Sequence, residues 1–256
     1  MPSPLAIVLA AGKGTRMKTD LPKVLAPVCG RPMVRYVVDA LRTAEVERVV
    51  VVVGYRAELV KEELAGEPGV AFAKQTEQRG TGHAVMMCRD ELEAFHAAGG
   101  GPVVIVTGDS PMLQVSSVKA LLEEFAATNP ACLLGTAHRD DPTGLGRVVR
   151  DTGGAFVGIV EEKDATDEQR AITEVNMSTY VFAADQLLRV LDQLTTNNAQ
   201  GEYYITDGPG LLQAEGKPVA ALPALQPCEA LSVNTPDDLA AVEAEMQRMQ
   251  AAADGQ

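Results

Sequence analysis

The run Leu5–Met17, LAIVLAAGKGTRM, joins an apolar segment to a glycine-rich turn. Its first part, Leu5–Leu9, has no polar residue, which is typical of a parallel strand buried on both faces. The two glycines of the turn let the backbone approach a phosphate chain closely and point N–H groups at it. Positive charge for such a ligand is available from Lys13, Arg16 and Lys23. The sequence therefore predicts a phosphate-binding turn at the carboxyl end of the first strand.

Two better-known glycine motifs do not match this turn. A P-loop requires Gly-x-x-x-x-Gly-Lys-Ser/Thr, which the turn lacks. A dinucleotide fingerprint requires a third glycine or alanine where Met17 stands, and an acidic residue after the next strand, where Gly54-Tyr55-Arg56 stands. A tight strand-to-helix turn with surface lysines is the structural alternative. The segment Leu21–Leu25, LPKVL, follows at once and makes that alternative the weaker one.

Composition limits the classes of protein to consider. The chain has 256 residues, enough for one large α/β domain. Hydrophobic residues make up 46% and aromatic residues 4%, so we expect a core of Val, Leu, Ala and Ile. A formal net charge of −13 argues against a nucleic-acid-binding surface, because such surfaces carry a basic stripe. A phosphate-binding cleft can still be a local basic feature of an acidic protein.

The cysteines and the N-terminal sequence indicate the cellular compartment of the protein. Cys29, Cys88, Cys132 and Cys228 lie far apart and form no Cys-x-x-Cys pair. We therefore expect free thiols in a reducing compartment, without a disulfide framework or a zinc site. The first apolar run is too short for a signal peptide, and no stretch approaches the length of a membrane span. These features predict a cytoplasmic protein with no membrane partner.

Strand-like and helix-like segments alternate along most of the chain, which predicts an α/β fold. We expect a Rossmann-like, mixed and mostly parallel sheet with helices on both faces. The expected parallel strands are Leu5–Leu9, Val49–Val53 and Val103–Val106. The expected helices are Pro32–Thr43, Ala57–Leu64 and Thr81–Ala97.

Beyond Asn129 the pattern changes to short alternating runs, which predict antiparallel strands. These runs are Leu133–Ala137, Gly146–Arg150, Phe156–Glu161 and Val175–Phe182. A final helix is expected from Pro236 to about Ala253, with Thr235 as its N-cap and Asp238 in its first turn.

Asp109 follows the apolar strand Val103–Val106 in the segment Thr107–Pro111, TGDSP. A carboxylate at the carboxyl end of a parallel strand faces the crevice in which α/β sheets bind ligands. Beside phosphates it is a suitable Mg²⁺ ligand, because Mg²⁺ is held by one or two carboxylates plus substrate oxygens. The alternative is a turn-forming Asp before Ser-Pro. The glycine-rich turn upstream favours the metal site.

A second distinctive segment is Gln75–Ala84, QTEQRGTGHA. The Gln75 amide offers both a donor and an acceptor to the edge of a nucleobase. Gly80-Thr81 at a helix start offers N–H groups to an anion or a base carbonyl. Taken alone, Gly-Thr-Gly is better explained as a helix N-terminus, and His83 as a structural residue.

Taken together, these segments resemble the N-terminal uridyltransferase domain of the bacterial bifunctional N-acetylglucosamine-1-phosphate uridyltransferase/glucosamine-1-phosphate acetyltransferase family, within the sugar nucleotidyltransferases. The long and unusual run Asn197–Asp207, NNAQGEYYITD, makes coincidence hard to credit. The matching segments span nearly the whole chain: Leu9–Met17, Leu21–Leu25, Gln75–Ala84, Gly108–Asp109, Asp141–Arg147, Gly158–Glu161, Lys163–Gln169, Asn197–Asp207 and Val233–Asn234.

The resemblance implies a role for each matched site residue. The groups implied to hold the uridine are the backbone at Leu9, Ala10, Ala11 and Gly12, together with Gln75, Gly80 and Thr81. Those implied to hold the phosphates and act in catalysis are Arg16 and Lys23. Those implied to ligate Mg²⁺ are Asp109 and Asn234, the latter also touching substrate. Those implied to contact the sugar phosphate are Gly146, Glu161 and Asn176. Without the resemblance, Glu161 is better explained as an exposed strand-end glutamate and Asn234 as a turn residue.

Two positions depart from the family pattern. Asn176-Met177-Ser178 stands where the family usually has Asn-Thr-Gly, and Thr107 stands where it usually has an aromatic residue. Both lie on the sugar side, so the nucleotide is implied more firmly than the sugar. The chain also has no hexapeptide repeat of the left-handed β-helix type. We therefore expect no acetyl transfer by this chain, and a monomer.

The function implied by the resemblance is Mg²⁺-dependent uridylyl transfer from UTP to N-acetyl-α-D-glucosamine 1-phosphate, a step toward peptidoglycan precursors. It would be carried out by one nucleotidyltransferase domain over 1–256, with a nucleotide-binding part at about 1–130, a sugar-binding part at about 131–234, and a C-terminal helix and tail at 235–256. No obligate protein partner is expected. Two alternatives stay open: a nucleotidyltransferase for another sugar 1-phosphate or base, and a catalytically silent nucleotide-sensing module.

Overall fold

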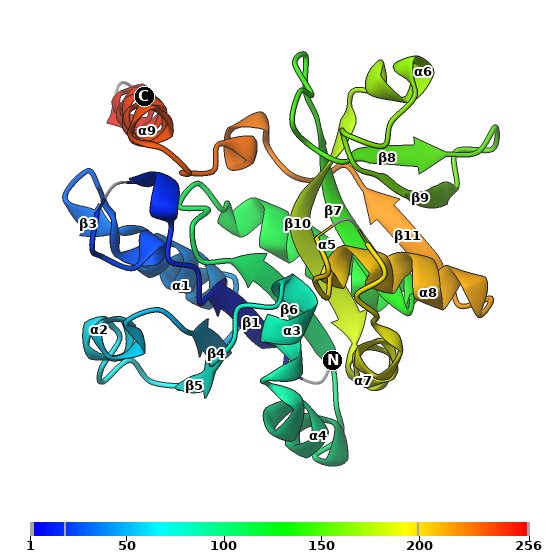
Figure 1. The fold of residues 1–256 in the computed structure, drawn as a ribbon, viewed down its shortest axis with the longest axis horizontal. Coiled ribbons are helices and arrows are strands. Elements are labelled where there is room, and N and C mark those ends of the chain that lie inside the picture. The colour runs from blue at the N-terminus through cyan, green and yellow to red at the C-terminus, as the bar shows by residue number, and fades with distance from the viewer. Residues whose placement is uncertain (1–2, 18, 199, 255–256) are drawn as a thin grey trace.

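The computed structural model describes residues 3–17, 19–198 and 200–254. A mixed sheet runs through the middle of the molecule in the strand order β11-β7-β10-β6-β1-β4-β5, and β8 and β9 branch from β10 (Figure 1). The strands of this sheet are β1 (Leu5–Ala10), β4 (Arg48–Val53), β5 (Val70–Lys74), β6 (Pro102–Thr107), β7 (Cys132–His138), β8 (Arg147–Arg150), β9 (Phe156–Val160), β10 (Glu174–Ala183) and β11 (Val219–Leu222). A short ribbon pairs β2 (Pro27–Val28) with β3 (Arg31–Pro32).

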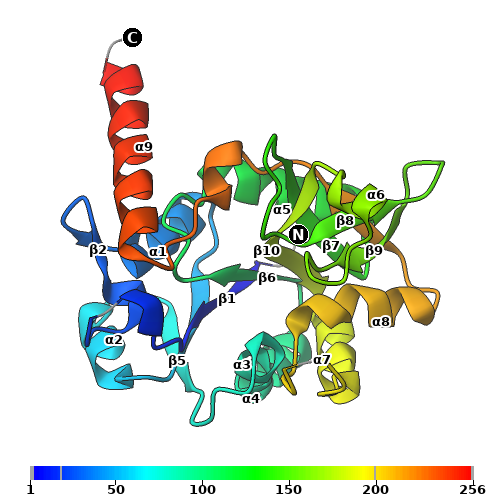
Figure 2. The same ribbon diagram turned by 45° about the horizontal axis from the view of Figure 1, so that its top comes forward.

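The helices lie on both faces of this sheet, as the sequence predicts. They are α1 (Met33–Thr43), α2 (Ala57–Glu63), α3 (Thr81–Met86), α4 (Arg89–Ala97), α5 (Val115–Thr128), α6 (Asp167–Arg170), α7 (Ala184–Gln193), α8 (Gly208–Ala214) and α9 (Pro236–Asp254). Figure 2 shows α1 and α5 on one side of the sheet, and α3, α4 and α7 on the other.

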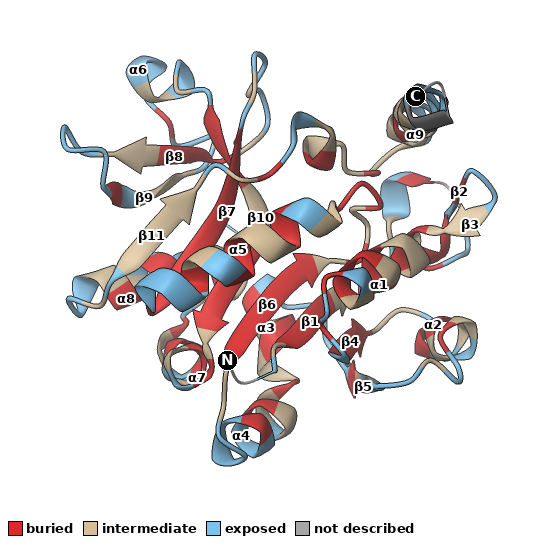
Figure 3. Cartoon of the chain, turned by 180° about the vertical axis from the view of Figure 1, so that it is seen from behind, coloured by how far each residue is buried: buried red, intermediate tan, exposed pale blue. Residues whose placement is uncertain are grey.

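The apolar β1 strand supplies side chains to both cores. Ala6, Val8 and Ala10 pack with α1 and α5, whereas Leu5 and Ile7 pack with α3, α4 and α7. The strand pairs in parallel with β4 and β6, which are buried in the same way (Figure 3). A strand covered on both faces needs apolar residues at every position, which explains the unbroken runs of Val and Ile.

The second half of the sheet is largely antiparallel, which confirms the change of pattern after Asn129. Strand β10 runs antiparallel to β6 and to β7, and β8 pairs antiparallel with β9. A bulge between Asn176 and Thr179 interrupts β10, and Ser178 there has a left-handed backbone with φ 52°. Because Tyr180 pairs with Ile105, the bulge lies beside the carboxyl end of β6.

The helix expected over Thr81–Ala97 is wrong in its continuity, because it forms two helices, α3 and α4. The amide of Cys88 donates to the carbonyl of Val85, three residues back, so the chain turns more tightly here than in an α-helix. Helix α3 packs against β1, the turn at Ile205–Asp207 and α7, whereas α4 packs chiefly against α7. The additional packing of α3 on β1 and on that turn gives the two halves different surroundings, which accounts for the break.

Several elements are absent from the sequence-based expectations: β5, α5, α7, α8 and β11. The final helix is confirmed, and Thr235 and Asp238 form its capping box, with Asp238 N–H donating to Thr235 Oγ1 at 3.2 Å and Thr235 N–H to Asp238 Oδ2 at 2.8 Å. Ala199 of the run Asn197–Asp207 and residues 255–256 of the expected tail lie outside the described residues. Among the helices that the structure describes, none is long and apolar enough to span a bilayer.

Candidate active site

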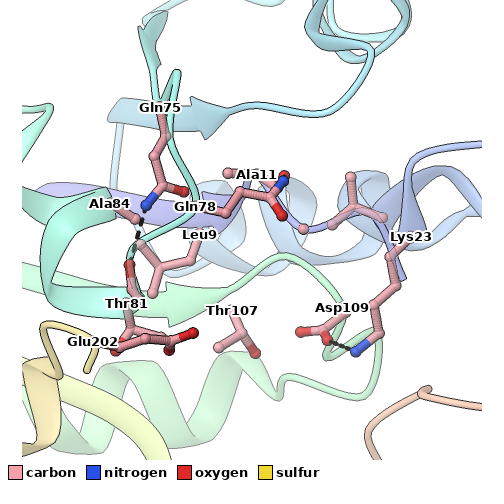
Figure 4. Close-up of a pocket in the computed structure, with 13 residues that line it drawn as sticks. Leu9, Ala11, Lys23, Gln75, Gln78, Thr81, Ala84, Thr107, Asp109 and Glu202 are labelled. Carbon is pink, nitrogen blue, oxygen red and sulfur yellow. Dashed lines mark hydrogen bonds and ion pairs between the residues drawn. The ribbon is translucent and has the colours of Figure 1, made fainter. Parts of the chain in front are cut away.

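A pocket of about 310 Å³ lies at the carboxyl ends of β1 and β6, where the sequence predicts ligand binding (Figure 4). Almost all residues that the resemblance implies to hold the uridine line this pocket, which we call the nucleotide pocket for that expected role: Leu9, Ala11, Gly12, Gln75, Gly80 and Thr81. Ala10 is the exception, because its side chain is buried on the opposite face of β1 with the α1 and α5 core. Lys23 and Asp109 complete the wall on the phosphate side.

The turn after β1 is held by the neighbouring strand ends. The carbonyl of Ala11 accepts from the Tyr55 N–H at 3.1 Å and from Gln78 Nε2 at 2.7 Å. Gly14 has φ +68°, and a Cβ built there would lie 2.7 Å from the Cβ of Lys23. The glycine therefore allows the left-handed turn and the close passage of the Lys23 side chain.

Four polar side chains from distant parts of the sequence converge beside this turn. The ammonium of Lys23 pairs with the Asp109 carboxylate and donates to Asn234 Oδ1 at 2.7 Å. The same Asn234 oxygen accepts from Arg16 at 2.9 Å. The Asn234 amide nitrogen donates to Ser232 Oγ at 3.1 Å, which turns the amide oxygen toward the two cations. The structure thus brings Arg16, Lys23, Asp109 and Asn234 together, as the resemblance implies.

The donor set of this cluster suits Mg²⁺. The side-chain oxygens of Asp109 and Asn234 both accept hydrogen bonds from the Lys23 ammonium, so they lie around one positive group. Carboxylate and amide oxygens are hard ligands, which Mg²⁺ prefers. Within the described part of the chain, no group of three or more His, Cys, Asp or Glu could hold a metal ion. An ion held by Asp109 and Asn234 would therefore take its other ligands from phosphate and water.

The two most distinctive sequence segments pack against each other. Gly82 N–H donates to the Tyr203 carbonyl at 2.8 Å, and Tyr203 N–H donates to the Arg79 carbonyl at 2.8 Å. Ile205 N–H donates to the hydroxyl of Thr81 at 3.2 Å. The run Asn197–Asp207 is thus hydrogen-bonded to the segment that carries Gly80 and Thr81, the corner of the nucleotide pocket, and holds it in place.

The residues expected at the sugar form a second group: Gly146 directly precedes β8, Glu161 directly follows β9, and Asn176 lies on β10. Asn176 N–H donates to the Gly146 carbonyl at 2.8 Å, and a Cβ on Gly146 would lie 3.4 Å from Glu161 Oε1. The Asn176 side chain is buried, donates to the Tyr180 hydroxyl at 2.9 Å, and accepts from Ser178 N–H at 3.3 Å. The structure therefore brings these residues together, but the Asn176 amide is already engaged within the protein.

The charge state of Glu161 is set by its surroundings. Partial burial, followed by the nearby carboxylates of Asp164 and Asp207, raises the pKa of Glu161 above its ordinary value. Glu161 is still exposed to solvent, so ligand hydroxyls can reach its carboxylate and donate hydrogen bonds to it. Glu161 is thus suited to bind a polyol.

Five lining residues are missing from the sequence-based site: the apolar Val24 and Ala84 and the polar Gln78, Thr107 and Glu202. Gln78 and Glu202 lie inside the segments Gln75–Ala84 and Asn197–Asp207, so the motifs marked their neighbourhood without marking the residues. Thr107 is one of the two positions that depart from the family pattern. Although expected on the sugar side, it lines the nucleotide pocket, and its hydroxyl lies 2.7 Å from the hydroxyl of Ser110.

Comparison with known proteins adds independent findings. A family model described as "MobA-like NTP transferase domain" matches residues 6–209. The "Bifunctional protein GlmU" of Geobacillus thermodenitrificans is 43% identical over 240 residues, covering 94% of this chain and 50% of the relative. The protein of the same name from Enterococcus faecalis is 44% identical over 229 residues, covering 90% of this chain and 49% of the relative. These relatives confirm the resemblance, and the chain spans about half their length.

Among solved structures, a putative glucose-1-phosphate thymidylyltransferase from Bacillus anthracis, in complex with a sucrose, superposes with a TM-score of 0.73. The two sequences are 19% identical, and the match covers 94% of each chain. The likeness confirms the expected α/β fold.

Proposed function

The chain belongs to the family of MobA-like NTP transferase domains, and from this membership and the site above we propose that it is a uridylyltransferase. Its substrates are UTP and N-acetyl-α-D-glucosamine 1-phosphate, and its products are UDP-N-acetylglucosamine and pyrophosphate. The observation that carries the proposal is the meeting of Arg16, Lys23, Asp109 and Asn234 beside a pocket of about 310 Å³. The widely spaced free cysteines and the nucleotide substrate support a cytoplasmic protein.

The phosphate chemistry requires positioning and charge neutralisation. The sugar phosphate oxygen is already an anion, so it attacks the α-phosphorus of UTP in line without a general base, and pyrophosphate leaves on the opposite side. Asp109 and Asn234 would hold Mg²⁺, which when bound offsets negative charge on the phosphates. Arg16 and Lys23 both donate to the Asn234 side-chain oxygen, so both cations lie beside the expected metal position. From there they would bind the phosphate oxygens of the substrates.

The base would be recognised by hydrogen bonds at the Gln75 end of the pocket. Gln75 is 5% exposed, and its amide nitrogen donates to the Gly80 carbonyl. Within the described residues its oxygen accepts no hydrogen bond, so it can accept from a donor such as N3–H of uracil, whereas N3 of cytosine is an acceptor. This asymmetry supports UTP as the donor nucleotide.

The test is a matrix of nucleoside triphosphates against sugar 1-phosphates, with pyrophosphate release as the readout. We expect UTP with N-acetylglucosamine 1-phosphate to give the highest kcat/KM, because a hydrogen-bonding site rejects partners that leave its groups unpaired. A higher kcat/KM with CTP or thymidine triphosphate would contradict the uridylyl assignment. Faster reaction with glucose 1-phosphate would contradict only the sugar assignment.

A second prediction concerns the sugar-binding part, which we propose is built by β7 to β10. We expect Glu161→Ala to raise the KM for the sugar phosphate about tenfold, the effect of losing one charge-assisted hydrogen bond. The KM for UTP should stay unchanged, because Glu161 is not part of the nucleotide pocket. Glu168→Ala is the control, since it removes an exposed carboxylate from the first turn of α6 that does not contribute to the raised pKa of Glu161. Equal effects of Glu161→Ala on both KM values would contradict a sugar-binding role.

A further inference from the structure

The polarity of the Gln75 amide is fixed by two acceptors. Gln75 Nε2 lies 3.1 Å from the Gly80 carbonyl and 3.1 Å from His83 Nδ1. A carbonyl oxygen can only accept, so the group that faces it must be the amide nitrogen. Its second N–H then points at His83 Nδ1, which accepts it only if the neutral ring carries its proton on Nε2. Figure 4 shows the Gln75 oxygen turned the other way, toward Gln78.

The His83 ring is itself held in place. It lies in the first turns of α3 and stacks on the ring of Tyr203, with 6.2 Å between ring centroids and 26° between planes. The Arg79 guanidinium also lies over the Tyr203 ring, 5.1 Å from its centroid. His83 therefore has little freedom to turn Nδ1 away from Gln75.

We infer that His83 is a positioning residue that sets the base specificity of the nucleotide pocket by orienting the Gln75 amide. The inference rests on the proposed function, in which Gln75 faces the base. With the amide held as observed, its oxygen accepts from N3–H of uracil and repels the N3 lone pair of cytosine. Reversing the amide would place its oxygen against the two acceptors, Gly80 O and His83 Nδ1. Loss of the His83 acceptor removes half of this restraint.

Two substitutions separate the hydrogen bond from the packing. His83→Phe keeps a flat ring against Tyr203 but has no acceptor, whereas His83→Asn places an amide oxygen near the position of Nδ1. We expect His83→Phe to lower the ratio of kcat/KM for UTP over CTP about tenfold, the worth of one hydrogen bond. The change should appear as a higher KM for UTP, whereas kcat at saturating UTP should stay within about twofold of the wild-type value. His83→Asn should keep the wild-type ratio.

The control is His96→Phe, because His96 is exposed on α4 and is not part of the nucleotide pocket. The inference is wrong if His83→Phe leaves the UTP to CTP ratio unchanged, or if His83→Asn loses it equally. A readout independent of activity is the ¹⁵N spectrum of the ligand-free protein, in which the His83 signals, assigned by their loss in His83→Phe, should show an unprotonated Nδ1. A protonated Nδ1 would overturn the inference even in an active uridylyltransferase. A wild-type enzyme that does not use UTP overturns the proposed function instead.

Discussion

Asp109→Asn and Asn234→Ala should each lower kcat by about 10²-fold or more, the effect of removing a key charge-stabilising group. The reason is geometric: the two side-chain oxygens are 125 positions apart in the sequence, yet both reach the Lys23 ammonium. If both ligate one Mg²⁺, either substitution disables the same ion. The double mutant should therefore fall well short of the product of the two single effects.

The measurement is kcat at saturating Mg²⁺ and saturating substrates, with thermal unfolding to show that each variant is folded. Removing the metal from the wild-type protein with a chelator should bring its rate down to that of the double mutant. Asp151→Asn is the matched control, because that exposed carboxylate only accepts backbone N–H groups in the turn between β8 and β9. Near-wild-type turnover in Asn234→Ala would leave Asp109 as the only protein ligand and refute the shared site.

The parts of this site that local sequence could predict are those that follow an apolar strand. β1 and β6 are unbroken apolar runs, and the residues after them, Gly12 and Asp109, are placed at one sheet edge by the parallel topology alone. The Leu5–Leu9 and Val103–Val106 predictions needed no tertiary information, because strands buried on both faces must be apolar throughout.

The remaining parts depend on contacts between distant segments. No local pattern links Lys23 to Asn234, 211 positions away, and only the family resemblance paired them with one site. The segment around Met87–Cys88 has no helix breaker, so the break between α3 and α4 comes from tertiary packing, since α3 also contacts β1 and the turn at Ile205–Asp207. By contrast, β5 did have a signal: Val70–Lys74 follows the turn-forming Gly66–Gly69, but it is short, lies at the sheet edge and has only one buried residue.

Gly80→Ala should reduce both the stability of the protein and its affinity for UTP. Gly80 has φ 101° and ψ 175°, a backbone conformation that is almost exclusive to glycine. A Cβ there would also lie 2.4 Å from the Tyr203 carbonyl oxygen, a backbone atom that cannot turn aside. Strain and overpacking together should lower the free energy of unfolding by about 3 kcal/mol. For a chain of this length the melting temperature should fall by roughly 6–12 °C.

Two further glycine substitutions separate the contributions of backbone strain and of overpacking to the lost stability. Gly99 has φ +110° with no atom within 4 Å of a built Cβ, so Gly99→Ala should show the backbone strain alone. Gly158 has neither a positive φ nor a close neighbour, so Gly158→Ala should change the melting temperature little.

If Gly80→Ala is no more destabilising than Gly99→Ala, the contact with Tyr203 does not require the glycine. A larger loss, accompanied by a raised KM for UTP, indicates that Tyr203 packs against the same corner that orients Gln75. The run Asn197–Asp207 then acts on the base through Gly80, because the Gly80 carbonyl is the acceptor that holds the Gln75 amide.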